Sequence, residues 1–226
     1  MPRWQTADLP AAGVWRVGRG DDPLSTATPV GADLGDSRVG NRFDSLTGAF
    51  RVLYFGTDLE ACFGETLSRF RADPKLAFID EEWEANRFMA RGAVPKDWRM
   101  RRTAVRVLIK TDRRFLDVEA LGTRKRLQRL LGPVLALFEV EDLDVAAIRG
   151  PDRRVTRLIA EWAWRQVDER GERAFAGLRY LSRIETGWEC WAVFDDVDIE
   201  ELERHPILET TPELLTVAEA YGLRVF

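Results

Sequence analysis

Apolar side chains recur at three- and four-residue spacing between Leu59 and about Phe70, which is typical of an amphipathic helix with Glu65 inside it. Thr57 stands just before this helix and Glu60 follows three residues later, which is a capping-box pattern for the first turn. The pair Asp73–Pro74 predicts the end of the helix. We therefore expect Glu65 on a short, capped helix.

Short runs of β-branched and aromatic residues predict strands before and after this helix, at Val14–Val17, Arg51–Phe55, Val105–Ile109 and Phe115–Val118. Two later runs, GLRYLS and GWECWAVF, have turn residues between them and predict an antiparallel strand pair. The stretch from Pro74 to Arg102 mixes tryptophan, charge and proline without a clean period. It predicts an irregular, partly helical excursion.

Three further helices are predicted. One covers Thr123–Leu131 and is interrupted by Gly132–Pro133. Asp152 is a suitable cap for a longer helix that ends near Gly171. Thr211–Pro212 starts a last short helix, because proline is favoured at the first helical position. The apolar face of the longer helix is predicted to hold Val155, Leu158, Ile159, Trp162 and Val167. Strands and helices in this mixture indicate the α+β class.

Length and composition favour one compact domain over residues 1–226, because 226 residues with 45% hydrophobic content can bury a core of their own. A net charge of −4 argues against binding to DNA or RNA. Cys62 and Cys190 form no C-x-x-C pair, so we expect a reducing, cytoplasmic location. The sequence shows no signal peptide and no membrane-spanning window, which favours a soluble protein.

The single histidine limits the chemistry further. His205 lies in a charged stretch before a proline, where we expect an exposed linker residue. Catalysis by a serine–histidine or cysteine–histidine pair, or by a histidine-bound metal, is therefore disfavoured, and we expect no metal. An enzyme with this sequence would rely on carboxylates, arginines, hydroxyls and aromatic rings. The arginine clusters at 99–102, 124–129 and 153–157 are typical of solvated faces.

Four ordered sequence blocks, VWRVG, GNRFDS, VLYFGTDLEACFGE and GLRYLSR…CWAVF, resemble the RES-domain family. That family is named after an arginine, a glutamate and a serine. The matching residues in this chain are Arg42, Glu65 and Ser182, and Arg16 and Tyr54 match two supporting positions. The resemblance spans most of the chain from Val14 to Phe194. It places an elaboration near residues 74–102 and an extension at 195–226.

The resemblance implies an ADP-ribosyltransferase-like fold, with mixed or antiparallel sheets and flanking helices. It also implies binding of NAD⁺ as substrate and cleavage of its nicotinamide–ribose bond by a growth-arresting toxin. The acceptor of the ADP-ribose group stays open between water, phosphate and a protein side chain. A non-catalytic module that binds a nucleotide stays open as well. The expected partner is an Xre-like helix-turn-helix antitoxin, with neither nucleic acid nor membrane bound directly, and a homo-oligomer stays open.

The roles that the resemblance implies agree with the chemistry of each residue type. Nicotinamide leaves as a neutral group from a cationic ring, so no general acid is needed, and Glu65 can stabilise the oxocarbenium-like ribose. Arg42 and Arg16 would bind the diphosphate. Tyr54 offers a ring to the pyridinium, and Ser182 would orient the ribose or the carboxylate. Each residue also has a structural alternative: a solvated or salt-bridged surface position for Glu65, an ion pair for the arginines, core packing for Tyr54, and a turn for Ser182.

Overall fold

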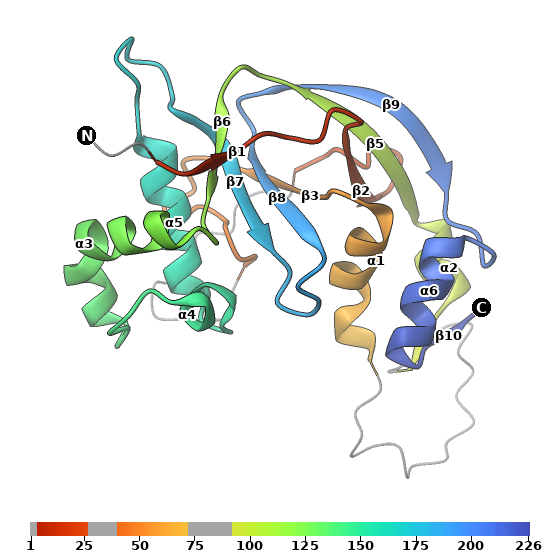
Figure 1. Cartoon of the computed structure of the whole chain (residues 1–226). Coiled ribbons are helices and arrows are strands. Elements are labelled where there is room, and N and C mark those ends of the chain that lie inside the picture. The colour runs from red at the N-terminus through yellow and green to blue at the C-terminus, as the bar shows by residue number, and fades with distance from the viewer. Residues whose placement is uncertain (1–3, 27–39, 72–91) are drawn as a thin grey trace. The chain divides into compact units, whose positions relative to one another are not determined.

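The computed structural model describes residues 4–26, 40–71 and 92–226 of the chain (Figure 1). These residues form two compact units, each assembled from separate stretches of sequence. The first unit comprises Met1–Ala11, Thr26–Tyr54 and Ile109–Ile199, and the second comprises Ala12–Ser25, Phe55–Leu108 and Glu200–Phe226. The expectation of a single domain over residues 1–226 stays a prediction.

The first unit contains a mixed sheet with the strand order β1-β6-β7-β8-β3. These strands are β1 (Thr6–Ala7), β6 (Arg114–Asp117), β7 (Phe175–Leu181), β8 (Glu189–Phe194) and the start of β3 (Val52–Gly56). Strands β6 and β7 run parallel, whereas β1–β6 and β7–β8 are antiparallel. Helices α3 (Leu121–Leu137), α4 (Val145–Arg149) and α5 (Arg153–Arg165) complete the unit. The predicted antiparallel pair is thus confirmed as β7 and β8.

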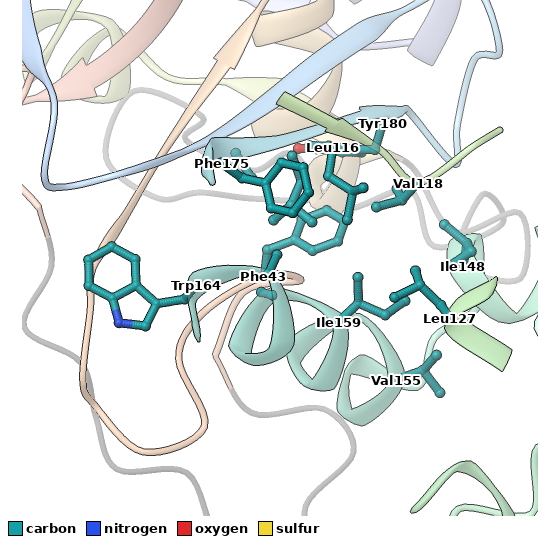
Figure 2. Close-up of a cluster of buried hydrophobic side chains, with 14 of the residues drawn as sticks. Phe43, Leu116, Val118, Leu127, Ile148, Val155, Ile159, Trp164, Phe175 and Tyr180 are labelled. Carbon is teal, nitrogen blue, oxygen red and sulfur yellow. The ribbon is translucent and has the colours of Figure 1, made fainter. Parts of the chain in front are cut away.

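A cluster of buried apolar side chains from the sheet and the helices forms the core of the first unit (Figure 2). Phe43 is fully buried among them, and its ring centroid lies 4.9 Å from that of Tyr180 in β7. Val155 and Ile159 of α5 are buried in the same cluster, as predicted for the apolar face of this helix. Burial of one such side chain contributes about 1.5–3 kcal/mol, so this cluster fixes α5 against the sheet.

The second unit contains the strand order β3-β2-β5-β9, with β2 (Val14–Arg19), β5 (Arg102–Lys110) and β9 (Asp198–Pro206). Strands β2 and β5 are antiparallel, and Trp15 pairs with Gly56 of β3. Helix α1 (Leu59–Leu67) packs against β2 and against α6 (Pro212–Tyr221). The other elements of the second unit are η1 (Ser68–Phe70), α2 (Lys96–Met100) and the parallel pair β4 (Ala93–Val94) and β10 (Arg224–Val225). The α+β class is confirmed.

The start of α1 differs from the predicted capping box. Asp58, not Thr57, is the N-cap residue, and its Oδ1 accepts a hydrogen bond of 2.7 Å from the backbone N of Ala61. An aspartate is a stronger cap than a threonine and carries a charge that suits the helix N-terminus. The predicted end of the helix at Asp73–Pro74 lies outside the described residues, as does most of the excursion predicted from residue 74 onward.

Helix α3 continues through Pro133 to Leu137, so the predicted interruption is wrong. A proline inside a helix costs roughly 3 kcal/mol or more, because one backbone hydrogen bond is lost and the ring crowds the preceding turn. Leu131 and Leu135 lie on either side of Pro133 and are both buried. Their burial offsets much of this cost and keeps the two halves of the helix in line.

Helix α5 ends at Arg165, earlier than the predicted end near Gly171. Val167, predicted to face the core, is 60% exposed and pairs instead with Arg173 in an isolated antiparallel bridge. The side chain of Arg173 donates to the backbone O of Trp164. This contact satisfies a carbonyl at the helix end and stops the helix where the extended segment begins.

Two expectations about basic residues are also corrected. His205 is exposed, as expected, but it lies in strand β9 and not in a linker, with its Nε2 2.7 Å from Oε2 of Glu203. Arg99, Arg102 and Arg157 are buried, so their predicted place on solvated faces is wrong. Each donates hydrogen bonds to backbone carbonyls, and these bonds allow a guanidinium to be buried.

No described helix is long and apolar enough to span a membrane.

The capping interaction of α5 yields a stability prediction. Oδ1 of Asp152 accepts a hydrogen bond of 2.9 Å from the backbone N of Arg154. Asp152→Ala should lower the free energy of unfolding by about 1 kcal/mol, whereas Asp152→Asn, which still caps, should lower it by much less. Urea denaturation of the two variants and the wild type measures both differences. Equal losses from the two substitutions would contradict the capping role.

The same carboxylate should make stability depend on pH. Partial burial acts to raise the pKa of Asp152, but hydrogen bonds from Arg154 outweigh it and hold the pKa below its ordinary value. A carboxyl group with a lowered folded-state pKa stabilises the fold above its unfolded-state pKa, and this contribution is lost as pH falls through the folded-state pKa. The stability difference between wild type and Asp152→Asn should therefore shrink in acid.

Candidate functional site

Arg42 lies in a turn that Asp44 and Tyr54 organise in the first unit; we call residues 40–47 the Arg42 loop. Oδ2 of Asp44 accepts 2.7 Å from the backbone N of Asn41, and Oδ1 accepts 2.9 Å from the hydroxyl of Tyr54. The Tyr54 hydroxyl in turn accepts 2.9 Å from the backbone N of Phe43. Gly40, at the start of the loop, has a φ of 75°, which glycine adopts without strain. The loop thus has one defined conformation.

The Tyr54 hydroxyl is a structural hydrogen-bonding group in this arrangement. Burial, followed by the nearby Asp44 carboxylate, raises the pKa of Tyr54 well above its ordinary value. The phenol is therefore neutral under all physiological conditions, and acid–base catalysis by Tyr54 is disfavoured. Its half-buried ring packs against the core of the first unit, as expected for a core aromatic. Core packing is compatible with a role of the ring toward a ligand, which stays a prediction.

The Arg42 side chain reaches the C-terminal end of α4. Its Nη1 donates to the backbone O of Ile148, and its Nη2 donates to the O of Arg149 at 3.5 Å. Carbonyls at a helix C-terminus carry partial negative charge, which suits a cation. These contacts orient the plane of the Arg42 guanidinium.

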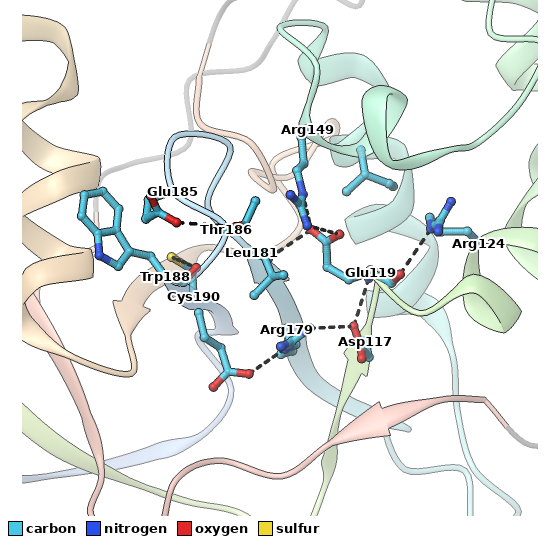
Figure 3. Close-up of polar contacts among 12 residues, drawn as sticks. Asp117, Glu119, Arg124, Arg149, Arg179, Leu181, Glu185, Thr186, Trp188 and Cys190 are labelled. Atoms are coloured by element: carbon cyan, nitrogen blue, oxygen red, sulfur yellow. Dashed lines mark hydrogen bonds and ion pairs between the residues drawn. The ribbon is translucent and has the colours of Figure 1, made fainter.

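A second set of contacts joins α4 to the end of β7 (Figure 3). The Arg149 guanidinium pairs with the Glu119 carboxylate, with Nη2 and Oε2 2.9 Å apart. Oε1 of the same carboxylate accepts 3.1 Å from the backbone N of Leu181, the residue before Ser182. The Glu119 side chain is only 8% exposed, so this pair is shielded from water. A chain of polar contacts therefore runs from Arg42 to the neighbour of Ser182.

Ser182 itself shapes the turn between β7 and β8. It is 0% exposed, and its Oγ accepts 3.0 Å from the backbone N of Ile184. Its backbone N donates to the O of Trp188 at 2.9 Å, which closes the turn. The turn alternative for Ser182 is confirmed, while a role toward a ligand stays a prediction.

Arg16 and Glu65 belong to the second unit. Nε of Arg16 donates 2.8 Å to the backbone O of Pro23. This contact depends on Gly18, because a Cβ there would lie 2.1 Å from the same oxygen. Glu65 is half-buried on α1, and the Tyr221 hydroxyl of α6 donates 3.1 Å to the O of the preceding residue, Gly64. Both side chains thus stand on elements that are tied in place.

Helix α1, which carries Glu65, packs on β2, which carries Arg16, and Cys62 of α1 bonds to the residue before Arg16. The pKa of Cys62 is raised to about 12, mainly by burial; a backbone hydrogen bond from Gly56 and the charge of Arg16 lower it, whereas the charges of Asp58 and Glu65 raise it. The thiol also donates 3.0 Å to the backbone O of Trp15. The structure therefore groups Arg16 with Glu65 in the second unit. It groups Arg42 with Tyr54 in the first unit, where the contacts through Glu119 lead on to Ser182.

A family model for the RES domain matches residues 13–214 of the chain. The chain belongs to the RES-domain family. RES domains are related to toxin–antitoxin systems, which implies an antitoxin partner, and they occur in NAD-related enzymes. No curated protein matches the chain in sequence. The matched range contains all of the residues that the sequence blocks predicted for the site.

Five residues that bond to the Arg42 loop or to its neighbours are not predicted as site residues from the sequence: Asp44, Glu119, Arg149, Arg157 and Glu161. Asp44 stands two residues after Arg42, and an aspartate in a turn is a signal that could have found it. The others could not be found in this way. Arg157 and Glu161 are four residues apart on a helix, and this spacing is typical of an exposed ion pair.

The buried Cys62 thiol yields a prediction about reactivity. Its pKa of about 12, against an ordinary value of 9.0, lowers the thiolate fraction roughly a thousandfold near neutral pH. Native protein treated with iodoacetamide should therefore remain almost unlabelled at Cys62, as peptide mass spectrometry can measure. Protein denatured in guanidinium provides the control and should be labelled at both cysteines. Rapid labelling of native Cys62 would contradict the burial of this helix face.

Proposed function

We propose that this RES domain binds NAD⁺ as its substrate and cleaves the nicotinamide–ribose bond by hydrolysis or phosphorolysis, so that its activity arrests growth. The observation that carries the proposal is the family match over residues 13–214, which includes Arg16, Arg42, Tyr54, Glu65 and Ser182. Protein ADP-ribosylation is the alternative for the same bond cleavage, because it differs only in the acceptor. An Xre-like antitoxin is the proposed partner.

Glu65 is the proposed catalytic carboxylate. Cleavage of NAD⁺ builds positive charge on the ribose ring, and a carboxylate hydrogen-bonded to a ribose hydroxyl stabilises that charge. Such stabilisation is greatest when the group needs no rearrangement during the reaction. Glu65 meets this condition, because α1 is packed on β2 and is joined to α6 by the Tyr221–Gly64 hydrogen bond.

Arg42 and Arg16 are the proposed diphosphate ligands. A guanidinium matches two phosphate oxygens with parallel N–H donors, and such charge-assisted bonds are about twice as strong as neutral ones. Each of the two side chains is held by backbone carbonyls, Arg42 by those of Ile148 and Arg149 and Arg16 by that of Pro23. Holding them in advance reduces the conformational entropy that binding would cost.

Tyr54 and Ser182 have supporting roles in the proposal. The hydroxyl of Tyr54 is used to fix the Arg42 loop, so its contribution to the ligand is the ring face, which can attract the pyridinium by about 0.5–2 kcal/mol. Ser182 fixes the turn after β7, and its proposed role toward the ligand is to orient the ribose by a hydrogen bond. Neither residue acts as a nucleophile.

Replacement of Glu65 provides the sharpest test of this mechanism. Glu65→Gln preserves size but removes the charge, and we expect kcat for nicotinamide release to fall by about 10²–10³-fold. Chromatography of the nicotinamide formed from NAD⁺ measures the rate. Glu60→Gln is the matched control on the first turn of the same helix and should retain wild-type kcat. A Glu65→Gln variant as active as the wild type would contradict the proposed role.

Arg42→Lys should affect binding more than the chemical step. The ammonium keeps the charge but loses the planar pair of donors, so KM for NAD⁺ should rise by about tenfold or more. Arg129→Lys, at an exposed position on α3, is the matched control.

Expression of wild type and Glu65→Gln in a bacterial host adds a cellular measurement. Equal growth arrest by the two would favour a non-catalytic binding module.

A further inference from the structure

Side chains on one face of α5 bond to the backbone of the Arg42 loop at several positions. Arg153, Thr156 and Arg157 are spaced by three and four residues, so their side chains project from the same side of the helix. They donate hydrogen bonds to carbonyl groups in this loop, namely those of Gly40, Arg42, Asp44 and Ser45. The helix therefore fixes the path of the chain on both sides of Arg42.

Arg157 is the central donor in this set. Its side chain is 2% exposed, with Nε 3.1 Å from the backbone O of Asp44 and Nη2 2.9 Å from that of Ser45. A buried guanidinium is strongly unfavourable unless its N–H groups are bonded. The loop must therefore keep these carbonyls in place whenever α5 is packed in the core. This coupling makes the loop conformation as stable as the packing of the helix.

Glu161 extends the same contacts by one helical turn. It is 5% exposed, and its Oε2 accepts 3.0 Å from the Ser45 hydroxyl and 3.2 Å from the backbone N of Leu46. Its Oε1 accepts 2.9 Å from the Thr47 hydroxyl and 2.8 Å from Nη2 of Arg165. A buried carboxylate bonded in this way fixes the far end of the loop.

We propose that Arg157 and Glu161 are positioning residues for NAD⁺ binding, because through the backbone of the Arg42 loop they hold the Arg42 guanidinium in the orientation that binds the diphosphate. This inference rests on the proposed function. Arg157 donates to backbone carbonyls of the loop, and Glu161 accepts from the loop and from Arg165. Both are therefore proposed to act through Arg42, as positioning residues and not as catalytic ones. Buried charges of this kind add little net stability compared with apolar residues of similar size, and a well-attested use of them is to select one conformation.

The experiment compares Arg157→Lys and Glu161→Gln with the wild type in two measurements. Lysine keeps the charge but cannot serve two carbonyls with a planar fork, and glutamine keeps the shape of Glu161 but loses its charge. Hydrogen exchange of backbone amides in residues 41–47 should become faster in both variants. KM for NAD⁺ should rise about tenfold while kcat falls less, because the variants loosen the group that binds the diphosphate.

Arg129→Gln is the control. Arg129 is exposed on α3, so its loss should leave exchange in residues 41–47 and the KM unchanged. Should Arg157→Lys fail to fold, Ser45→Ala provides the same comparison, because it removes one loop hydroxyl that binds Glu161.

Each outcome supports or overturns the inference. Faster exchange together with a raised KM supports positioning. Lower stability with unchanged KM and kcat in the folded variants would show that α5 serves the fold alone, and would overturn the positioning role while leaving the proposed function intact. Failure of the proposed function looks different, because the wild type itself would then release no nicotinamide, and both proposals would fall together.

Discussion

The guanidinium of Arg157 is buried in the first unit and is balanced by carbonyl groups of a loop more than a hundred residues away in sequence. An isolated charge in a protein interior costs several kcal/mol, so loop and helix must adopt their conformations together. Arg42 lies in that loop, so the position of its backbone is fixed by the same contacts. From Arg42, contacts run through the end of α4 and the Glu119–Arg149 pair to the residue before Ser182. Under the proposed function, this geometry orients the Arg42 guanidinium toward the diphosphate.

The regular elements were largely predictable because their signals are local. Helical spacing predicts α1 and α5, and short runs of β-branched and aromatic residues predict β2, β3 and β5 to β8. Residue type alone predicts the Asp152 cap of α5 and the start of α6 at Thr211–Pro212. Two of the errors arise because tertiary contacts override local preference. Burial of Leu131 and Leu135 carries α3 through Pro133, and Arg173 bonds to Trp164 where local periodicity predicts that α5 continues.

The candidate site was predictable as a set of residues but not as a set of contacts. Ordered blocks identified Arg16, Arg42, Tyr54, Glu65 and Ser182, yet no spacing in the sequence shows that Tyr54 bonds to Asp44 or that Glu161 bonds to Ser45. Those contacts are non-local, and an arginine and a glutamate four residues apart on a helix have an equally good exposed interpretation. Structure was needed to show that this pair faces inward.

The chemistry proposed for this RES domain requires little catalytic machinery, because the departing nicotinamide needs no proton and one carboxylate can stabilise the ribose cation. The most direct test is mass analysis of the small molecules formed when the purified wild-type protein is incubated with NAD⁺ and inorganic phosphate. The account predicts free nicotinamide together with an equal amount of ADP-ribose or its 1″-phosphate. Quantitative recovery of intact NAD⁺, from protein shown to be folded, would contradict it.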